Sequence, residues 1–327
     1  MEVESTPAPC RIVVHGGGLA VRWVGPFAAD DRQRLRSWCD AVGPAVVNDI
    51  GRSSGQAGRG VVIGSWNMAV GEGDLHSLVE QLRAERPGSE VIVLLQEAYR
   101  AEAPPSDCPA ASRRARALAR PRPPGSSDIV TLAARVGMNL ASAPSMRNGL
   151  DCAVEPREDR GNGILSTLPL SDVAMIELPF AQQRRVAVAA RVRTAGGDVG
   201  LVSVHFDTLR GHAAMAEGMA QALRILGWRG PLVVAGDFNS ALPFDGGMRE
   251  MRRHFAELDC GGGATHETGR RLDHMFIGLE DAPFGCRTGG VRYGSDHNPL
   301  IAVVPADERL RPQAVGSVGF AEPASVR

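Results

Sequence analysis

Apolar residues along most of this chain fall into short runs, separated by segments rich in Gly, Pro, Asn and Asp. Runs of this kind, rich in Val, Ile and Leu, predict buried β-strands. We expect strands at 61–66, 91–96, 163–166, 173–178, 186–192, 199–205, 232–235, 273–277 and 299–304. Apolar positions at helical spacing predict helices at 74–86, 128–136 and about 211–226. Many strands with few, interspersed helices predict an α+β domain of packed sheets flanked by helices.

Residues 1–58 show the weakest pattern, and we interpret them as an N-terminal extension that could pack on the main domain. Two short apolar runs, at 11–14 and 19–23, flank the triple glycine at 16–18 and predict a strand pair around a turn. A helix is expected near 31–39. The glycines lack the following Lys-Ser or Lys-Thr of a phosphate loop, so a turn is the better interpretation.

The main domain is expected at 59–304, with two segments of different composition at 101–127 and 305–327. Segment 101–127 is rich in Pro and Arg and predicts a flexible insertion. Its arginines could contact a polyanion or be solvated without a partner. The tail at 305–327 is predicted to be disordered.

Polar residues stand at or just after the ends of the apolar runs. Asp237 and Asn239 follow the run at 232–235 and are two positions apart, so their side chains point to the same side of an extended chain. This pair suits a metal-bound phosphate. The segments placed in the same way are Trp66-Asn67, Gln96-Glu97, Gly161-Asn162-Gly163-Ile164-Leu165-Ser166, His205, Arg271-Leu272-Asp273-His274 and Ser295-Asp296-His297. We expect these strand ends to converge on one polar site.

Charge and composition narrow the function classes. The net charge of -1 over 327 residues argues against nucleic-acid binding through a global positive field, although it leaves a local cleft open. All 36 basic residues are Arg, which we attribute to genome base composition more than to phosphate binding. The 6 Cys residues form no Cys-x-x-Cys pair, so no zinc or redox motif is indicated, and Cys10 with Cys39 is a candidate disulfide.

The sequence also bears on location. No apolar stretch approaches the length of a membrane span. The acidic N-terminus lacks the pattern of a secretory signal, so a cytoplasmic location is favoured and export stays open if a leader has been removed. No protein partner can be inferred.

Glu97 is the first candidate metal ligand. It follows a buried apolar strand, where an unpaired carboxylate is costly, so we expect a cation beside it. Oxygen ligands from Glu97, with Asn67 beside it, suit Mg²⁺ or Mn²⁺, and the absence of a Cys/His cluster argues against zinc. Phosphate ester cleavage needs such a cation, an activated water and a group that stabilises the departing oxygen.

Taken in order, these motifs resemble those of the endonuclease/exonuclease/phosphatase superfamily. That superfamily includes deoxyribonuclease-I-like nucleases, abasic-site endonucleases, inositol polyphosphate phosphatases and bacterial sphingomyelinases. The resemblance runs from about residue 61 to residue 304, through Ser65-Trp66-Asn67, Leu95-Gln96-Glu97, the Gly161–Ser166 segment, Val204-His205, Gly236-Asp237-Phe238-Asn239, Arg271-Leu272-Asp273-His274 and Gly294-Ser295-Asp296-His297-Asn298-Pro299-Leu300. It implies a four-layered α/β/β/α sandwich of two mainly antiparallel sheets flanked by helices, with the active site at one edge.

The resemblance also implies roles for the polar residues. Asp237 would orient or deprotonate the attacking water, and Asn239 would hold a phosphate oxygen and the charge that develops on it. His297 would act as general base or electrostatic stabiliser, oriented by Asp273. Asp296 would complete the metal environment.

Three further residues are assigned in the same way. His205 would stabilise the phosphorane or protonate the leaving oxygen. Asn162 would order the edge of the active site or serve a turn, and with Asn239 and Arg160 it is expected to bind the substrate phosphate. His266 and His274 flank the site in sequence, and either could be functional or structural.

The chain departs from the family pattern at one metal position. In the abasic-site endonucleases an Asp two places after the first Asn helps to bind metal, and here that position is Ala69. Glu72 or Asp74 could replace it, or the site uses only Asn67 and Glu97.

The leading hypothesis is divalent-metal-dependent hydrolysis of phosphodiester bonds by a deoxyribonuclease-I-like nuclease, with nucleic acid as the substrate. Basic contacts are expected from the insertion and from a patch formed by Arg184, Arg185, Arg270 and Arg271. The alternative is a phosphatase or phosphodiesterase of small phosphoesters or lipid headgroups, although no apolar docking hairpin is evident. A third hypothesis, an inactive binding module, conflicts with the retention of Asn67, Glu97, His205, Asp237, Asn239, Asp273, Asp296 and His297, since such modules usually lose ligands.

Overall fold

The computed structural model describes residues 10–16, 19–50, 60–102, 128–147, 157–240, 242, 245–278, 281 and 284–305. The predicted insertion at 101–127 and the predicted tail at 305–327 lie outside the described residues, apart from positions 101, 102 and 305.

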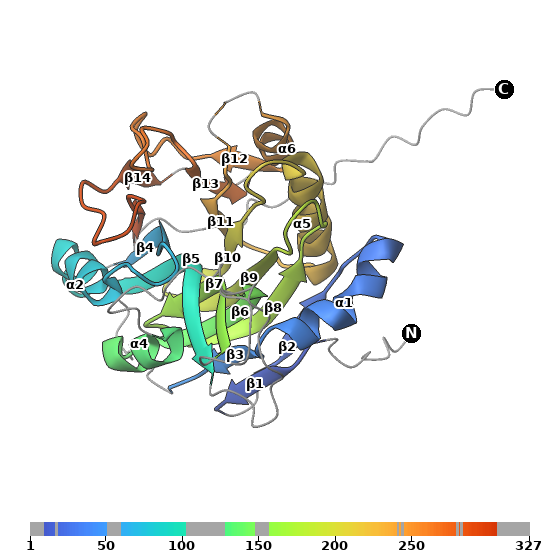
Figure 1. Cartoon of the computed structure of the whole chain (residues 1–327). Coiled ribbons are helices and arrows are strands. Elements are labelled where there is room, and N and C mark those ends of the chain that lie inside the picture. The colour runs from blue at the N-terminus through green and yellow to red at the C-terminus, as the bar shows by residue number, and fades with distance from the viewer. Residues whose placement is uncertain are drawn as a thin grey trace.

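Two β-sheets stacked face to face form the centre of the molecule (Figure 1). The strands are β1 (Ile12–His15), β2 (Val21–Val24), β3 (Ala45–Asn48), β4 (Gly60–Asn67), β5 (Glu90–Glu102), β6 (Asn139–Arg147), β7 (Arg157–Ser166), β8 (Leu170–Glu177), β9 (Val186–Thr194), β10 (Gly197–His205), β11 (Leu232–Asp237), β12 (Phe255–Glu257), β13 (Asp273–Gly278), β14 (Gly285–Thr288) and β15 (Leu300–Pro305). An 8-stranded sheet has the order β1-β3-β6-β7-β5-β4-β15-β14, and a 7-stranded sheet has the order β12-β13-β11-β10-β9-β8-β2. Most neighbours are antiparallel, and the parallel pairs are β1–β3, β4–β5, β10–β11 and β2–β8.

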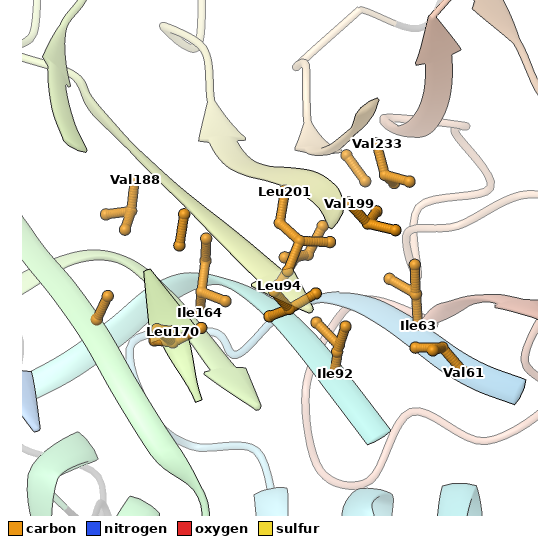
Figure 2. Packing of buried hydrophobic residues seen from close by; sticks show 14 of the residues in the cluster. Val61, Ile63, Ile92, Leu94, Ile164, Leu170, Val188, Val199, Leu201 and Val233 are labelled. Atoms are coloured by element: carbon orange, nitrogen blue, oxygen red, sulfur yellow. The ribbon is translucent and has the colours of Figure 1, made fainter. Parts of the chain in front are cut away.

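Apolar side chains from both sheets interdigitate between them. Ile63 and Leu94 of the 8-stranded sheet lie opposite Leu201 and Val233 of the 7-stranded sheet, and all four are buried (Figure 2). Runs that are apolar at nearly every position give strands that are buried on both faces, because helices cover the outer faces.

Helices form the two outer layers (Figure 1). The apolar faces of α2 (Leu75–Glu85) and α4 (Ile129–Val136) pack on the outer face of the 8-stranded sheet. Those of α5 (His212–Leu226) and α6 (Gly246–His254) pack on the outer face of the 7-stranded sheet. The predicted four-layered sandwich is therefore confirmed. No helix in the described part of the chain is long and apolar enough to cross a membrane.

Helices α2 and α4 begin where the sequence predicts. The Asp74 carboxylate accepts the backbone N–H of Ser77, and that of Asp128 accepts the N–H groups of Val130 and Thr131. These bonds satisfy amide groups that have no partner within the first turn of a helix. Asp74, one of the two residues considered for the metal position at Ala69, thus has both carboxylate oxygens bonded to Ser77.

The N-terminal strands join different sheets, so the strand pair predicted around residues 16–18 is wrong. β1 pairs in parallel with β3, and β2 pairs in parallel with β8 of the other sheet. Each strand has only 4 residues, so its apolar pattern carries no information about a distant partner. The helix expected near 31–39 is confirmed as α1 (Ala29–Ala41), and a disulfide joins Cys10 to Cys39.

Candidate active site

The polar strand ends meet at one edge of the sandwich. In the 7-stranded sheet His205, Asp237 and Asp273 lie side by side at the ends of β10, β11 and β13. In the 8-stranded sheet Asn67 ends β4 and pairs with Gln96 of β5. The Asn67 amide Nδ2 donates to Asp237 Oδ2 at 3.0 Å, which joins the two sheets at this edge.

A close backbone approach and a tight turn position Asp237. A Cβ at Gly236 would lie 1.8 Å from the Val204 carbonyl oxygen, so only glycine allows β10 and β11 to run this close. Asn239, at φ 51°, follows in a left-handed turn. Its backbone N–H donates to Asp237 Oδ1 at 2.8 Å, and its Nδ2 donates to the Phe206 carbonyl at 3.1 Å. Asp237 is therefore held through both carboxylate oxygens.

Hydrogen bonds to residues of both sheets fix the position of His297. Its Nδ1 lies 2.7 Å from Asp273 Oδ2, and its Nε2 lies 3.7 Å from Asp237 Oδ2. The Ser295 hydroxyl accepts the His297 backbone N–H at 3.0 Å and donates to the Asn67 carbonyl at 2.7 Å. Because Nδ1 is engaged by Asp273, Nε2 is the nitrogen that faces the site.

Burial and neighbouring charges shift three pKa values at this point. Burial, with the adjacent Asp273 carboxylate, raises the pKa of Asp237 to about 6. Burial, with the charge of Arg185, lowers the pKa of His205 well below its usual value. Burial also lowers the pKa of His297, but the contact with Asp273 and the charge of Asp237 outweigh it and raise that pKa to about 9. At neutral pH His297 is thus cationic and His205 neutral.

Glu97 lies in strained backbone at the same edge. Its φ of 50° is in the left-handed region, at an irregularity where the pairing of β5 with β7 shifts register. Arg160 of β7 approaches it, with Nη1 3.6 Å from Glu97 Oε1. Backbone strain of this kind clusters at functional sites.

The donor atoms at this edge fit a hard divalent cation. Asn67 and Glu97 offer amide and carboxylate oxygens, which suit Mg²⁺ or Mn²⁺. Burial, together with the adjacent Asp273 carboxylate, raises the pKa of Asp237, and a cation beside these two carboxylates would offset both effects. In the described residues the potential ligand atoms within 4.8 Å of one another form two groups here, Asp237/Asp273/His297 and His266/Asp296/His297.

Two arginines of the basic patch predicted from the sequence, Arg184 and Arg185, lie just before β9 and have different partners. Arg184 pairs with buried Glu177, away from the site. Arg185 is buried at the site, where it interacts with the charges of Glu97 and Asp237, and burial lowers its pKa to about 10.

Asn162 occupies a buried position between the sheets. Its Nδ2 donates to the Val186 carbonyl at 2.8 Å, which links β7 to β9. This bond connects the two sheets, because β7 and β9 belong to different ones.

The two flanking histidines differ. The His266 ring packs against that of His297, with ring centroids 4.7 Å apart. His274 points to the opposite side of β13 from Asp273, where its Nδ1 lies 2.7 Å from Glu257 Oε1. Sequence reasoning left both open, since only the course of the loop between Thr265 and Asp273 brings His266 to the site.

Residues 64–297 match the model of the Endonuclease/Exonuclease/phosphatase family. The chain belongs to this family. Its members are hydrolases that act on phosphoesters.

Solved structures of the Endonuclease/Exonuclease/phosphatase family share the fold. A family protein from Leptotrichia buccalis C-1013-b matches with a TM-score of 0.54 and 13% identity, covering 75% of this chain and 99% of that chain. One from Beutenbergia cavernae DSM 12333 matches with a TM-score of 0.52 and 21% identity, covering 76% of this chain and 72% of that chain. One from Bacteroides vulgatus has a TM-score of 0.51 at 13% identity, with coverages of 75% and 98%. A comparison with curated proteins found no match.

Proposed function

We propose that this protein is a divalent-metal-dependent phosphodiesterase, a nuclease of the deoxyribonuclease-I-like type. The observation that supports this best is the convergence on Asp237. Its Oδ2 accepts from Asn67 and lies 3.5 Å from His205 Nε2 and 3.7 Å from His297 Nε2. A buried carboxylate between two imidazoles is suited to proton transfer and charge stabilisation at a single point.

Asp237 orients the attacking water and accepts its proton. Its pKa of about 6 lies near neutral pH, which suits a general base. His297 stabilises negative charge on the phosphate oxygens, since the Asp273 contact keeps its ring cationic and directs Nε2 into the site. Of the two roles considered for His297, electrostatic stabiliser is therefore the one we propose.

His205 and Asn239 contribute hydrogen bonds to the phosphate. His205 is neutral at pH 7, so it stabilises the phosphorane as a hydrogen-bond partner and is poorly suited to act as the acid. Asn239 uses one of its two amide hydrogens on the Phe206 carbonyl and has the second for a phosphate oxygen.

The cation is proposed to be Mg²⁺ or Mn²⁺, held by Asn67 and Glu97, with Asp296 completing its surroundings. When bound, it neutralises charge on the phosphate oxygens. Arg160 and Arg185 add fixed positive charge beside Glu97, where they can hold the phosphate of the substrate.

Exposed arginines around the site support a nucleic-acid substrate. Arg210, Arg270 and Arg292 are exposed in the segments that adjoin His205, Asp273 and Asp296 in the chain. Guanidinium groups in such positions suit the phosphates on either side of the one that is cleaved.

One observation favours a lipid headgroup as the second candidate. Leu209, Leu242 and Val291, three of the large apolar side chains that are exposed, are 73%, 59% and 57% accessible and lie in segments that follow or precede the site strands. Exposed apolar side chains of this kind could contact a membrane surface.

Parallel assays on supercoiled plasmid, sphingomyelin vesicles and bis-p-nitrophenyl phosphate separate these candidates. Each is run with Mg²⁺, Mn²⁺ or EDTA, and the Asp237→Asn variant is the blank. Plasmid nicking that disappears with EDTA and in the variant supports the nuclease. Cleavage of vesicle lipid without nicking would overturn it in favour of the second candidate, and cleavage of the small ester alone would leave only the metal-dependent centre.

The described disulfides change the expected compartment. Cys10–Cys39 and Cys260–Cys286 are both paired, and such bonds persist in oxidising surroundings. We therefore propose export in place of a cytoplasmic location. Thiol titration of the protein from its native source tests this, since free thiols at these four positions would contradict it.

A further inference from the structure

His266 stands on a short loop that is anchored by the residues of the active site. It forms an isolated antiparallel bridge with His297, and the Asn298 backbone N–H donates to the Thr265 carbonyl at 2.7 Å. The buried Thr265 hydroxyl accepts the backbone N–H of Asp273 at 3.0 Å. The backbone that carries His266 is thus bonded to the strands that carry the His297–Asp273 pair, so His266 has a fixed position beside them.

Hydrogen bonds within the loop determine the tautomer of His266. The backbone N–H of Thr268 donates to His266 Nδ1 at 3.1 Å, and the Thr268 hydroxyl lies 2.7 Å from the same atom. A backbone amide can only donate, so Nδ1 must be the acceptor nitrogen of the ring. The proton of the neutral imidazole is therefore on Nε2.

The Nε2–H of His266 faces Asp296 and makes no hydrogen bond of normal length to any residue that the structure describes. The Nε2 atom lies 3.5 Å from Asp296 Oδ2, beyond the usual range of an N–H···O hydrogen bond. The side chain is 16% exposed, so a ligand can reach it. Asp296 Oδ1 lies 3.9 Å from His297 Nε2, which places the Nε2 atoms of both histidines around one carboxylate.

Metal coordination by His266 is the competing interpretation. Its spacing from Asp296 and His297 would allow the three to share an ion. A histidine that binds metal through Nε2 keeps its proton on Nδ1 and donates it to a neighbour. Here the Thr268 N–H occupies the Nδ1 lone pair, so the tautomer of His266 favours donation over coordination.

We propose that His266 is a substrate-binding residue that donates its Nε2–H to an oxygen of the phosphate beside His297. This inference rests on the proposed function, because it assumes a phosphoester at this centre. His266 would add a donor to the phosphate oxygens from the side opposite β10. No covalent bond to His266 forms or breaks.

Three variants test the donor. His266→Phe keeps a ring against His297 and removes the donor, whereas His266→Gln places an amide N–H near the position of Nε2–H. Glu267→Gln is the matched control, since it changes an exposed neighbour on the same loop. The kcat and KM for bis-p-nitrophenyl phosphate are measured with Mg²⁺, together with the inhibition constant of inorganic phosphate and the thermal midpoint.

The Phe variant is expected to lose roughly 10- to 100-fold in kcat/KM, the usual effect of one charge-assisted hydrogen bond. It should also bind phosphate more weakly at an unchanged thermal midpoint, and the Gln variant and the control should stay within about 3-fold of the wild type. A Phe variant with wild-type kinetics and phosphate inhibition would overturn the donor role. A folded Gln variant that loses about 10-fold or more in kcat/KM would overturn it as well. This second outcome needs no folded Phe variant.

The two proposals fail in distinguishable ways. If the wild type hydrolyses the small ester but not DNA, the nuclease proposal fails and the His266 comparison still decides the donor. If the wild type hydrolyses no phosphoester, both proposals fall.

Discussion

Replacing Asp237 with Asn removes a charge at the centre of the site while keeping the shape of the side chain. The amide oxygen can still accept the Asn239 N–H, which Asp237 Oδ1 accepts at 2.8 Å. In the wild type, Asn67 Nδ2 donates to Asp237 Oδ2 at 3.0 Å. In the variant, the new amide nitrogen takes the place of that oxygen and faces Asn67 Nδ2. Two donors face each other, and one buried hydrogen bond is lost.

The expected change in stability is small because opposing effects nearly cancel. A buried donor without an acceptor costs about 1–3 kcal/mol. In the opposite direction, the substitution removes a charge that is unfavourable in the folded protein. Burial and repulsion by Asp273 destabilise the Asp237 carboxylate, and both raise its pKa. We therefore expect a net change below about 3 kcal/mol in the free energy of unfolding, and a shift of several degrees at most in the thermal midpoint. Loss of a positioned base should lower kcat by roughly 10²- to 10⁴-fold.

Circular dichroism melts and bis-p-nitrophenyl phosphate hydrolysis with Mg²⁺ measure the two effects on the same samples. Asp198→Asn is the matched control, because Asp198 lies at the other end of β10 and pairs with Arg191 and Arg193 on the surface. It should keep the wild-type rate. A folded Asp237→Asn variant that retains more than about a tenth of that rate would refute the assigned base.

Asp273→Asn should lower kcat by roughly 10²- to 10⁴-fold and lower the pKa of His297, because the carboxylate that holds Nδ1 is lost; a pH–rate profile unchanged from the wild type would contradict this. Burial raises the pKa of Glu257, but its bond to His274 outweighs burial and lowers that pKa to about 2. The stability that this gives is complete above the unfolded-state pKa near 4.5 and is lost as pH falls toward 2. Glu257→Gln should flatten that acid-side decline in urea midpoints, and an unchanged slope would count against the pair. Reduction of the disulfides that span 29 and 26 residues should lower the free energy of unfolding by about 3–4 kcal/mol each, and a calorimetric midpoint unaffected by reductant would argue against them.

The central strands could be predicted from the sequence because they are buried on both faces. A continuous run of Val, Ile and Leu predicts such a strand even when the strands that pair with it are unknown. The sequence pattern did not indicate β6, whose Asn139–Arg147 segment mixes Ala and Ser with Pro144. It also did not indicate α6, where the buried side chains are Met248 and Met251 on an otherwise polar helix. Both elements form because tertiary packing overrides a weak local pattern.

The core of the candidate site could be predicted because strand ends mark it. His205 and Asp237 end the parallel strands β10 and β11, and Asp273 begins the antiparallel strand β13, so their convergence follows from sheet geometry. The assignments of Arg185 and His266 depended on contacts that local sequence does not encode. Arg185 and its neighbour Arg184 contact different partners just before β9, and His266 lies on a loop whose path is determined by tertiary bonds.

The most direct test of metal-dependent phosphoester hydrolysis is a Mg²⁺ titration of EDTA-treated protein. Initial rates of bis-p-nitrophenyl phosphate hydrolysis are compared between the wild type and Glu97→Gln. We expect no rate in EDTA, saturable recovery with Mg²⁺ for the wild type, and a lower maximum with a higher Mg²⁺ requirement for the variant. Hydrolysis that persists in EDTA, or a variant that recovers as the wild type does, would contradict the site built here from Asn67, Glu97 and Asp237.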